Sequence, residues 1–446
     1  MKNLLIKLRP SSDGKDADVV ISNNKGKLKK TIKHVDIKVI EFPNENAAQN
    51  ALKGLKHSKD VLFAEEDKVI PPDLIPNDPY YSAQWHLPAI NAPAAWDVTT
   101  GSPDIIIAIL DTGVNPHVDF EDRLLPGFNT NDNSTDTSDV YGHGTKVAGV
   151  AAAVGNNGLS VAGIAWNCKI LPVRVSGVDG NGSYADISEG LVWAADNGAR
   201  VANISYDASA SLSIASSAQY FQNNGGVVVI AAGNTNTVRN WPGNYSFLVV
   251  SGTNSDGTKA SFSNTGSNID LAAPAVGITT TSPGGGESQA SGTSFAAPIV
   301  SGVAGLLLSQ NPGLSGQDAR LTLRQSGADY GTPGWDAIFG AGIIDAFSAL
   351  QPKTLNYPPT ATITSHVNGE TVRNVETIQI SYNDDIGVVK AELFVAGVLT
   401  NTSTTAPFST SWNVKPISSG SYQVQVVVYD ALHNAGLSQI LTLVKR

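Results

Sequence analysis

The chain has 446 residues, of which only 15% are charged, and its formal net charge is −10. This length is too great for one ordinary hydrophobic core, so two or three domains are expected. The acidic balance and the lack of a basic patch argue against nucleic-acid binding, and no apolar run approaches the ~20 residues of a membrane span.

The first segment, residues 1–73, is predicted to be a small α+β unit. Apolar alternation indicates strands at 4–8, 35–42 and 61–64, and helical spacing covers 46–56. Prolines at 71, 72 and 76 predict an exposed connector. The apolar run from Leu4 to Ile6 is too short for a signal-peptide core, so either the protein is not secreted or its leader has been removed.

The central segment, residues 74–350, alternates expected strands with helical patterns. Its strands are almost continuously apolar, which predicts a mostly parallel, doubly wound α/β sheet covered on both faces. Cys168 is the only cysteine, which excludes a disulfide framework, and its apolar neighbours predict a small buried residue. Strands are expected at 104–110, 170–175, 201–204, 227–231 and 247–251, and helices at 144–154, 184–197 and 294–310.

The last segment changes character after Pro352. Residues 351–358 are predicted to be a linker, and 359–446 show alternating runs without a helical period, which predicts an all-β sandwich. Strands are expected at 361–364, 377–382, 390–395, 408–412, 422–429 and 439–444.

Three short runs that contain glycine also contain an aspartate, a histidine and a serine. Asp111 closes an apolar stretch, His143 lies between two glycines, and Ser294 follows a Gly-Thr pair. A serine hydroxyl needs a base with a pKa near the working pH, which favours histidine, and a carboxylate must hold that imidazole in one tautomer. The chain order Asp, His, Ser is one of the orders in which this triad occurs.

The expected elements would bring these groups to one edge of the sheet. Asp111 follows a buried strand, so its carboxylate is expected at the carboxyl edge. His143 and Ser294 each open a helix, at the positive end of the helix dipole. Pro298 is expected in the first turn of the second helix, where a missing N–H costs little. Asn234 ends a strand in Gly-Asn and is expected to donate its amide to a developing oxyanion.

Each of these residues alone has a simpler explanation as a turn former or a helix cap. Together, in this order and context, they favour a nucleophilic site. A lipase or esterase would place the serine first, within Gly-x-Ser-x-Gly, whereas here it comes last and Ala296 replaces the final glycine. The alternative that stays open is a protein without catalytic activity that binds or adheres to a partner through the β-rich tail.

These runs resemble the subtilisin-like serine proteases, or subtilases, especially the thermitase-type branch, over about residues 76–350. The resemblance implies a serine endopeptidase that acts through an acyl-enzyme on protein or peptide substrates. It implies Ser294 as nucleophile, His143 as base, Asp111 as orienting carboxylate and Asn234 in the oxyanion hole. A monomer is expected.

The resemblance also implies that substrate adds as a strand between two segments. Where the family usually has Leu-Gly-Gly, this chain has Tyr206-Asp207-Ala208, so bulk and charge are expected to narrow the cleft or favour basic side chains. The matching residues are Gly180, Asn181, Gly182, Tyr184, Ile187, Ser205, Tyr206 and Asp207.

Calcium is the cofactor that the resemblance implies. An all-oxygen shell from carboxylates, an Asn side chain and backbone carbonyls suits this hard ion. Taken as a sequence pattern alone, the Asn-Asn-Gly at 156–158 equally fits a simple turn. The matching residues are Asp78, Asp132, Val154, Asn157, Leu159 and Val161.

Residues 1–73 resemble the inhibitory, fold-assisting propeptide of secreted subtilases, and this resemblance implies that the chain is a self-processing zymogen. Cleavage is expected between Asp67 and Pro76. The tail resembles immunoglobulin-like domains of bacterial extracellular enzymes, with Trp412 in its core. A secreted protein is therefore expected.

Overall fold

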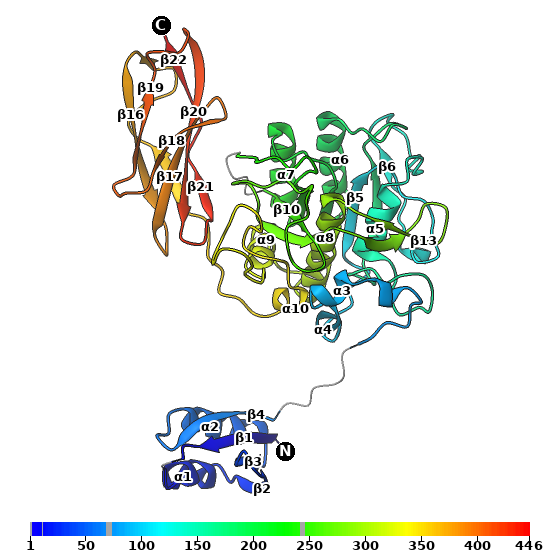
Figure 1. Cartoon of the computed structure of the whole chain (residues 1–446), viewed down its shortest axis with the longest axis vertical. Coiled ribbons are helices and arrows are strands. Elements are labelled where there is room, and N and C mark those ends of the chain that lie inside the picture. Colours follow the sequence, from blue (N-terminus) through cyan, green and yellow to red (C-terminus); the bar gives the residue numbers. More distant parts are fainter. Residues whose placement is uncertain (1, 11, 68–73, 241–245) are drawn as a thin grey trace. The chain divides into compact units, whose positions relative to one another are not determined.

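The computed structural model describes residues 2–10, 12–67, 74–240 and 246–446 (Figure 1). The chain divides into two compact units, Met1–Pro72 and Asp73–Arg446. Residues 71 and 72 of the predicted connector, and most of the segment expected to be cleaved, lie outside the described residues.

The first unit is a four-stranded antiparallel sheet, of order β2-β3-β1-β4, with two helices. Helix α2 begins where the side chain of Asn44 accepts the amide of Ala47 at 2.9 Å. The sequence analysis does not predict α1 and β2, because α1 buries only Ala17 and every residue of β2 is exposed. The elements are β1 (Lys2–Leu8), α1 (Lys15–Asn23), β2 (Lys27–Ile32), β3 (Ile37–Phe42), α2 (Glu45–Lys56) and β4 (Val61–Glu66).

The second unit is built on a seven-stranded sheet, which confirms the predicted parallel fold. Its order is β11-β10-β9-β8-β5-β7-β6, and every pair is parallel. Almost every residue of the inner strands is buried, as expected for a sheet covered on both faces. The strands are β5 (Ile106–Asp111), β6 (Phe128–Asn129), β7 (Lys169–Arg174), β8 (Val201–Ile204), β9 (Val227–Ala231), β10 (Leu248–Thr253) and β11 (Leu271–Pro274).

Helices cover both faces of this sheet (Figure 1). Because strand side chains alternate between faces, Ile107 and Ile109 join one core cluster while Ala108 and Leu110 join the other. The first cluster includes α5 (Gly144–Ala152) and α8 (Thr293–Gln310), and the second includes α6 (Tyr184–Asp196) and α7 (Leu212–Asn223). Smaller elements are η1 (Tyr81–Ala83), α3 (His86–Ala89), α4 (Ala92–Trp96), η2 (Glu121–Arg123), β12 (Ile278–Thr281), β13 (Glu287–Ala290), α9 (Gly316–Arg324) and α10 (Ala346–Ala349).

Helix α8 is the central core helix. Among the described residues it is the one helix long and apolar enough to span a membrane, but 89% of that stretch is buried inside the domain. The predicted burial of Cys168 is confirmed, since its Sγ lies beside the hydroxyl of Ser309 and burial raises the pKa of the thiol.

The prediction that Pro298 lies in the first turn of its helix is wrong. Helix α8 begins at Thr293, so Pro298 lies in its second turn. A proline there cannot donate to the carbonyl four residues earlier, which belongs to Ser294. That carbonyl instead accepts a hydrogen bond from the hydroxyl of Ser205 at 2.8 Å. The proline therefore leaves the carbonyl of Ser294 available for this hydrogen bond, which connects the start of α8 to the end of β8.

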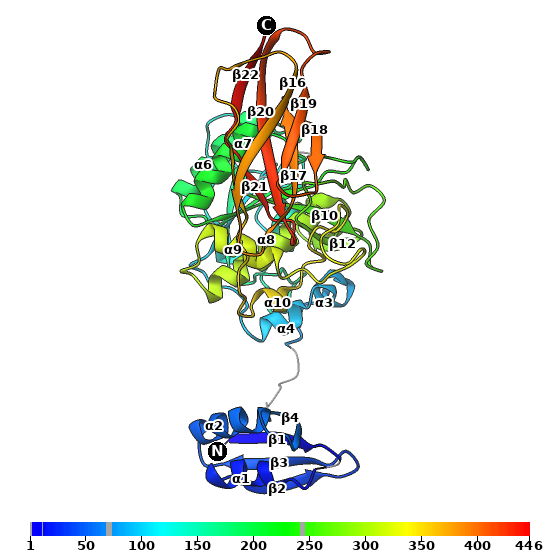
Figure 2. The ribbon, with the colours of Figure 1, turned by 90° about the vertical axis from the view of Figure 1, so that its left-hand side faces the viewer.

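The C-terminal part is an all-β sandwich, as predicted (Figure 2). One sheet has the order β14-β16-β19 and the other β15-β22-β20-β17-β18, with β21 paired to β20. Trp412 is buried between them, as expected. The sequence analysis does not predict β15, β18 and β21, which are short or mostly exposed. The strands are β14 (Thr360–Ile363), β15 (Thr371–Val372), β16 (Val375–Asn383), β17 (Val388–Val395), β18 (Val398–Ser403), β19 (Ser409–Asn413), β20 (Gly420–Asp430), β21 (Ala435–Leu437) and β22 (Leu441–Lys445).

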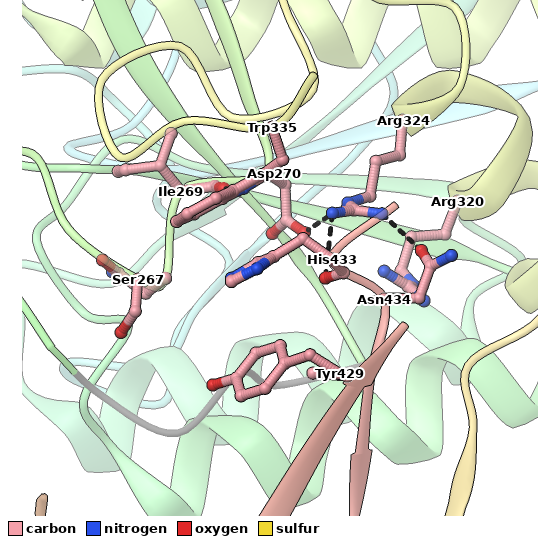
Figure 3. Close-up of a pocket in the computed structure, with 11 residues that line it drawn as sticks. Ser267, Ile269, Asp270, Arg320, Arg324, Trp335, Tyr429, His433 and Asn434 are labelled. Carbon is pink, nitrogen blue, oxygen red and sulfur yellow. Dashed lines mark hydrogen bonds and ion pairs between the residues drawn. The ribbon is translucent and has the colours of Figure 1, made fainter. Parts of the chain in front are cut away.

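The loop between β20 and β21 joins the sandwich to the α/β domain (Figure 3). Arg324, at the end of α9, donates to the side chain of Asn434 and to the carbonyls of Leu432 and His433, the latter two at 3.1 Å. The same guanidinium lies 3.4 Å from the carboxylate of Asp270. One arginine thus links the two domains through a buried network.

An aromatic stack reinforces this junction. The ring of His433 lies 3.4 Å from that of Trp335, nearly parallel to it, and 4.4 Å from that of Tyr429. Burial lowers the pKa of His433 to about 2, so the imidazole is neutral at ordinary pH. These rings and Arg324 line a cavity of about 20 Å³, room for about one water molecule. The sandwich is therefore anchored by side chains as well as by the linker.

We expect Arg324→Ala to destabilise the second unit by about 3 kcal/mol, because the partly buried Asp270 loses its ion pair and the loop carbonyls lose their donor. Differential scanning calorimetry should then show separate transitions for the sandwich and the α/β domain. Arg373→Ala is the control, since Arg373 is exposed on the sandwich and its side chain makes no hydrogen bond or ion pair with the described residues. An unfolding profile identical to that of the unaltered chain would contradict the junction.

Candidate active site

Asp111 and His143 meet at the carboxyl edge of the sheet. Asp111 ends β5 and is fully buried, and its Oδ1 accepts hydrogen bonds from Nδ1 of His143 and from the amide of Thr112, both at 2.8 Å. His143 immediately precedes α5. The next residue must be glycine, because a Cβ on Gly144 would lie 2.1 Å from the carbonyl oxygen of Gly113. This close approach lets α5 begin directly beside the strand.

The surroundings of His143 raise its pKa. Burial alone would lower its pKa, but the charge and hydrogen bond of Asp111, aided by Asp139, outweigh burial and raise the pKa above the usual value. Oδ2 of Asp111 is buried and accepts no hydrogen bond from the described residues. An imidazole held in this way can accept a proton and stabilise the resulting charge, as a general base requires.

Ser294 lies at the N-terminus of α8, close to this pair. Its hydroxyl donates to the carbonyl of Ser205 at 3.1 Å. In the part of the chain that the structure describes, no hydrogen bond joins Ser294 to His143. The imidazole instead packs against Phe295, with ring centroids 5.5 Å apart. Catalytic hydrogen bonds are often long or poorly aligned when no substrate is bound. Here the side chain of Ser294 would have to rotate before its hydroxyl could donate to His143.

The amide of Asn234 is oriented by the same helix start. Its Oδ1 accepts hydrogen bonds from the backbone amide and the hydroxyl of Thr293, at 2.8 and 2.9 Å. These two hydrogen bonds fix the orientation of the side-chain amide, so that Nδ2 points away from Thr293. A Cβ on Gly292 would lie 3.3 Å from Nδ2, so glycine leaves space around this donor. Nδ2 is free among the described residues to donate to a negative oxygen.

The two segments matched to substrate binding are joined by Tyr206. Its hydroxyl donates to the carbonyl of Gly180 at 3.1 Å, and a Cβ on Gly182 would lie 3.4 Å from its ring. Burial raises the pKa of Tyr206, which keeps the phenol protonated as a donor. Ser205 directly precedes Tyr206 and contacts Ser294, so one of the two segments reaches the reaction centre.

The other predicted substrate residues differ in exposure. The amide of Asn181 donates to the carboxylate of Asp179 at 2.8 Å, within its own turn. Tyr184 is exposed at the first position of α6, whereas Ile187 is buried in the core beneath it.

Asp207 has an ion-pair partner that the sequence does not predict. Its Oδ2 accepts a hydrogen bond from Nη2 of Arg239 at 2.8 Å. The charge of the carboxylate is therefore balanced by a cation, and the effect of Asp207 on substrate preference stays a prediction.

Most residues matched to the metal site surround one loop. The carboxylate of Asp78 accepts the backbone amides of Asn156 and Asn157, and burial raises its pKa. The side-chain oxygen of Asn157 accepts the amide of Leu159 at 2.8 Å. Among the described residues, no hydrogen bond reaches the carbonyl oxygens of Val154, Leu159 and Val161. Unpaired carbonyls beside a buried carboxylate fit a hard cation.

Asp132 does not join this loop in the described structure. It is exposed, and its carboxylate accepts the amide of Ser134 at 3.1 Å within its own turn. Across the described ranges, no group of three or more His, Cys, Asp or Glu side chains could hold a metal ion. A cation here would therefore depend on backbone carbonyls.

The sequence analysis misses three charged residues at these sites. Asp139 is buried and accepts hydrogen bonds from Thr112 and Thr145, which fixes the turn before His143. Asp119 accepts the side chain of Asn157 and the amide of Val161 at the metal loop. Arg239 pairs with Asp207. Asp139 has one sequence signal, its place just before His143, whereas the other two contacts join segments far apart in the chain.

Three family models match the chain. A model described as the subtilase family matches residues 102–342. A fervidolysin N-terminal prodomain matches residues 2–67, and a bacterial Ig domain matches residues 359–426.

Similar proteins cover the α/β domain. Thermitase from Thermoactinomyces vulgaris is 41% identical over 281 residues, which are 62% of this chain and 99% of that protein. A thermophilic serine proteinase from Bacillus sp. strain AK1 is 36% identical over 304 residues, 67% of this chain and 75% of that protein. A solved structure of a protease from Pseudoalteromonas arctica is 34% identical, with a TM-score of 0.55, and the match covers 62% of this chain and 98% of that one.

We expect the pKa of His143 to fall below its usual value in Asp111→Asn, because burial then acts without the opposing carboxylate. An NMR titration of the histidine ring protons measures this shift. Asp122→Asn, which removes an exposed carboxylate elsewhere on the domain, should leave the titration unchanged. An unchanged His143 pKa in Asp111→Asn would show that the carboxylate does not control the imidazole.

Proposed function

Because the chain belongs to the subtilase family of serine endopeptidases, we propose that Ser294 is its nucleophile, His143 its general base and Asp111 the carboxylate that orients the imidazole. The observation that supports this assignment most directly is the 2.8 Å hydrogen bond between His143 and the buried Asp111. The family relationship lends no support to the alternative of an inactive binding protein.

In the proposed reaction, Oγ of Ser294 attacks the carbonyl carbon of the scissile bond while its proton passes to Nε2 of His143. Asp111 holds the proton on Nδ1, so that Nε2 is the free base. The imidazolium then protonates the leaving amine, which departs and leaves an acyl-enzyme on Ser294. The same imidazole accepts a proton from water as water attacks the ester. The bond between the carbonyl carbon and Oγ then breaks, the imidazolium returns the proton to Oγ of Ser294, and the acid product leaves.

We further propose that Nδ2 of Asn234 stabilises the oxyanion of each tetrahedral intermediate. The support is its orientation, since Thr293 occupies Oδ1 and leaves the amide hydrogens free. Such a donor is effective because it is held in place before the charge develops, and removing one typically costs about 10²–10³ in rate. The site therefore combines a base, a nucleophile and a fixed dipole at two helix starts and a strand end.

We propose that the first unit is an inhibitory propeptide that the enzyme removes from itself. The support is the prodomain match over residues 2–67 and the separate compactness of Met1–Pro72. The domain limits proposed are 1–73 for the propeptide, 74–350 for the catalytic domain, 351–358 for the linker and 359–446 for the immunoglobulin-like sandwich.

Purified precursor is expected to lose a fragment the size of the first unit, whereas Ser294→Ala should stay at full length because it lacks the nucleophile. Gel electrophoresis and intact-mass measurement over time check this. Ser216→Ala, at an exposed serine on α7, is the matched control and should process normally. Shortening of purified Ser294→Ala at the normal rate would contradict the proposed nucleophile.

We propose that loop 154–161 and Asp78 hold a structural calcium ion. The carbonyls of Val154, Leu159 and Val161, the side chain of Asn157 and the buried Asp78 would supply the oxygens. The ion would neutralise Asp78 and the neighbouring Asp119, two carboxylates whose burial and proximity are otherwise unfavourable. Its role would be to brace the loop that follows α5.

A chelator is expected to lower the melting temperature, because an ion that binds only the folded state adds about 2.7 kcal/mol at a hundredfold excess over its Kd. The measurement uses the Ser294→Ala background, which prevents self-digestion. In Asp78→Ala, the chelator should no longer change the melting temperature. Asp132→Ala tests whether Asp132, the second carboxylate that the sequence predicts at this site, also binds the ion. A chelator response that is absent, or that Asp78→Ala leaves intact, would contradict the site.

We also propose that the mature enzyme acts on proteins and peptides outside a bacterial cell. The prodomain and the bacterial Ig domain fit that setting. So does a single cysteine that is buried rather than exposed to oxidation.

A further inference from the structure

The ion pair between Asp207 and Arg239 lies beside the proposed reaction centre. Asp207 lies two residues after Ser205. The carbonyl of Ser205 accepts a hydrogen bond from the hydroxyl of the proposed nucleophile, Ser294. On its other side, a Cβ on Gly233 would lie 2.6 Å from Oδ2 of Asp207, and Gly233 directly precedes Asn234. The carboxylate is therefore packed between the segment that contacts the nucleophile and the segment that carries the oxyanion donor.

A network of hydrogen bonds holds the pair in place. The backbone amide of Arg239 donates to the carbonyl of Thr265 at 2.6 Å. Asn264 donates to the carbonyl of Ala232 at 2.9 Å and to Asp207 at 3.4 Å. Its oxygen accepts amides from the loop between Asn234 and Arg239, at 3.0 and 3.1 Å. These bonds fix the backbone that carries Arg239 and one side of Asp207, and the guanidinium is held by its bond to Asp207.

The pair is accessible to solvent. The side chain of Asp207 is 32% exposed and that of Arg239 is 31% exposed. In an acyl-enzyme the substrate carbonyl carbon is bonded to Ser294, and its oxygen points toward Asn234. The side chain of the substrate residue that carries this carbonyl would then lie near segments 205–207 and 232–234, which meet at the contact between Asp207 and Gly233.

We propose that Asp207 and Arg239 line the pocket for the substrate residue on the acyl side of the cut, and that their mutual neutralisation makes this pocket prefer an uncharged side chain. The proposal rests on the proposed function, because it assigns specificity at the same site. A charged substrate side chain meets attraction from one partner and repulsion from the other at similar distances, so little Coulomb energy offsets the loss of its hydration. An uncharged side chain avoids that loss.

The pair predicts opposite responses when either charge is removed. Arg239→Gln leaves Asp207 unbalanced, so cleavage after Lys should rise about tenfold relative to cleavage after Leu, the order expected for a partly screened charge contact. Asp207→Asn leaves Arg239 unbalanced and should favour Glu by a similar factor. The double variant should again prefer Leu. Both shifts should shrink in high salt, because the groups are partly exposed.

The experiment measures kcat/KM of the self-processed enzymes on three peptides that differ only in the residue before the cut: Lys, Glu or Leu. Asp122→Asn changes the net charge as Asp207→Asn does, at an exposed carboxylate near Arg123, and should leave the three ratios unchanged. Arg239→Lys keeps the charge and should keep the preference for Leu, which provides a second test if Arg239→Gln folds poorly.

The proposal is overturned if each variant changes all three peptides by the same factor, or if Lys and Glu respond in the same direction. Either result would make the pair a structural contact only. Failure of the proposed function looks different, because the unaltered enzyme would then cleave none of the peptides. Opposite shifts for Lys and Glu, cancelled in the double variant, establish the pair as the determinant of selectivity.

Discussion

The site depends on a buried carboxylate that accepts a hydrogen bond from one imidazole. Asp111 ends the strand β5, which is hydrogen-bonded to β7 on one side and β8 on the other, so the sheet fixes its position. One carboxylate oxygen accepts His143 and Thr112, and the other accepts nothing among the described residues. Burying such a group costs free energy unless a positive charge can form beside it. This constraint explains why the charge and hydrogen bond of Asp111 raise the pKa of His143 against the effect of burial.

The same edge of the sheet orders the other groups through backbone contacts. Pro298 leaves the carbonyl of Ser294 without its helical donor, and Ser205 supplies a hydrogen bond in its place. Asn203 in turn donates to the hydroxyl of Ser205 at 2.9 Å. Strand β8 and helix α8 are thereby locked at the point where the nucleophile is proposed to act. Because the backbone on both sides is held in place, a small rotation of the Ser294 side chain determines whether its hydroxyl can donate to the imidazole of His143.

Local patterns predicted much of the architecture and little of its long-range polar pairing. The parallel sheet was predictable because buried strands such as Val227–Ala231 are apolar throughout, and Asp111 and His143 were predictable because their chemistry is specific. The position of Pro298 within its helix was not predicted correctly, because α8 begins at Thr293, one residue before Ser294. The partner of Asp207 and the anchor of the sandwich at Arg324 join distant segments, and neither periodicity nor composition records such contacts. Exposed elements such as β2 were also missed, because they lack a buried face.

The central claim is that Asp111, through His143, activates Ser294. Reaction with a sulfonyl fluoride, followed by peptide mass spectrometry, measures the reactivity of this hydroxyl without any choice of substrate. The account predicts one adduct, on Ser294, formed at a rate that falls by about 10³ or more in both His143→Ala and Asp111→Asn. An adduct on another residue, or a rate that either substitution leaves unchanged in a folded protein, would contradict it.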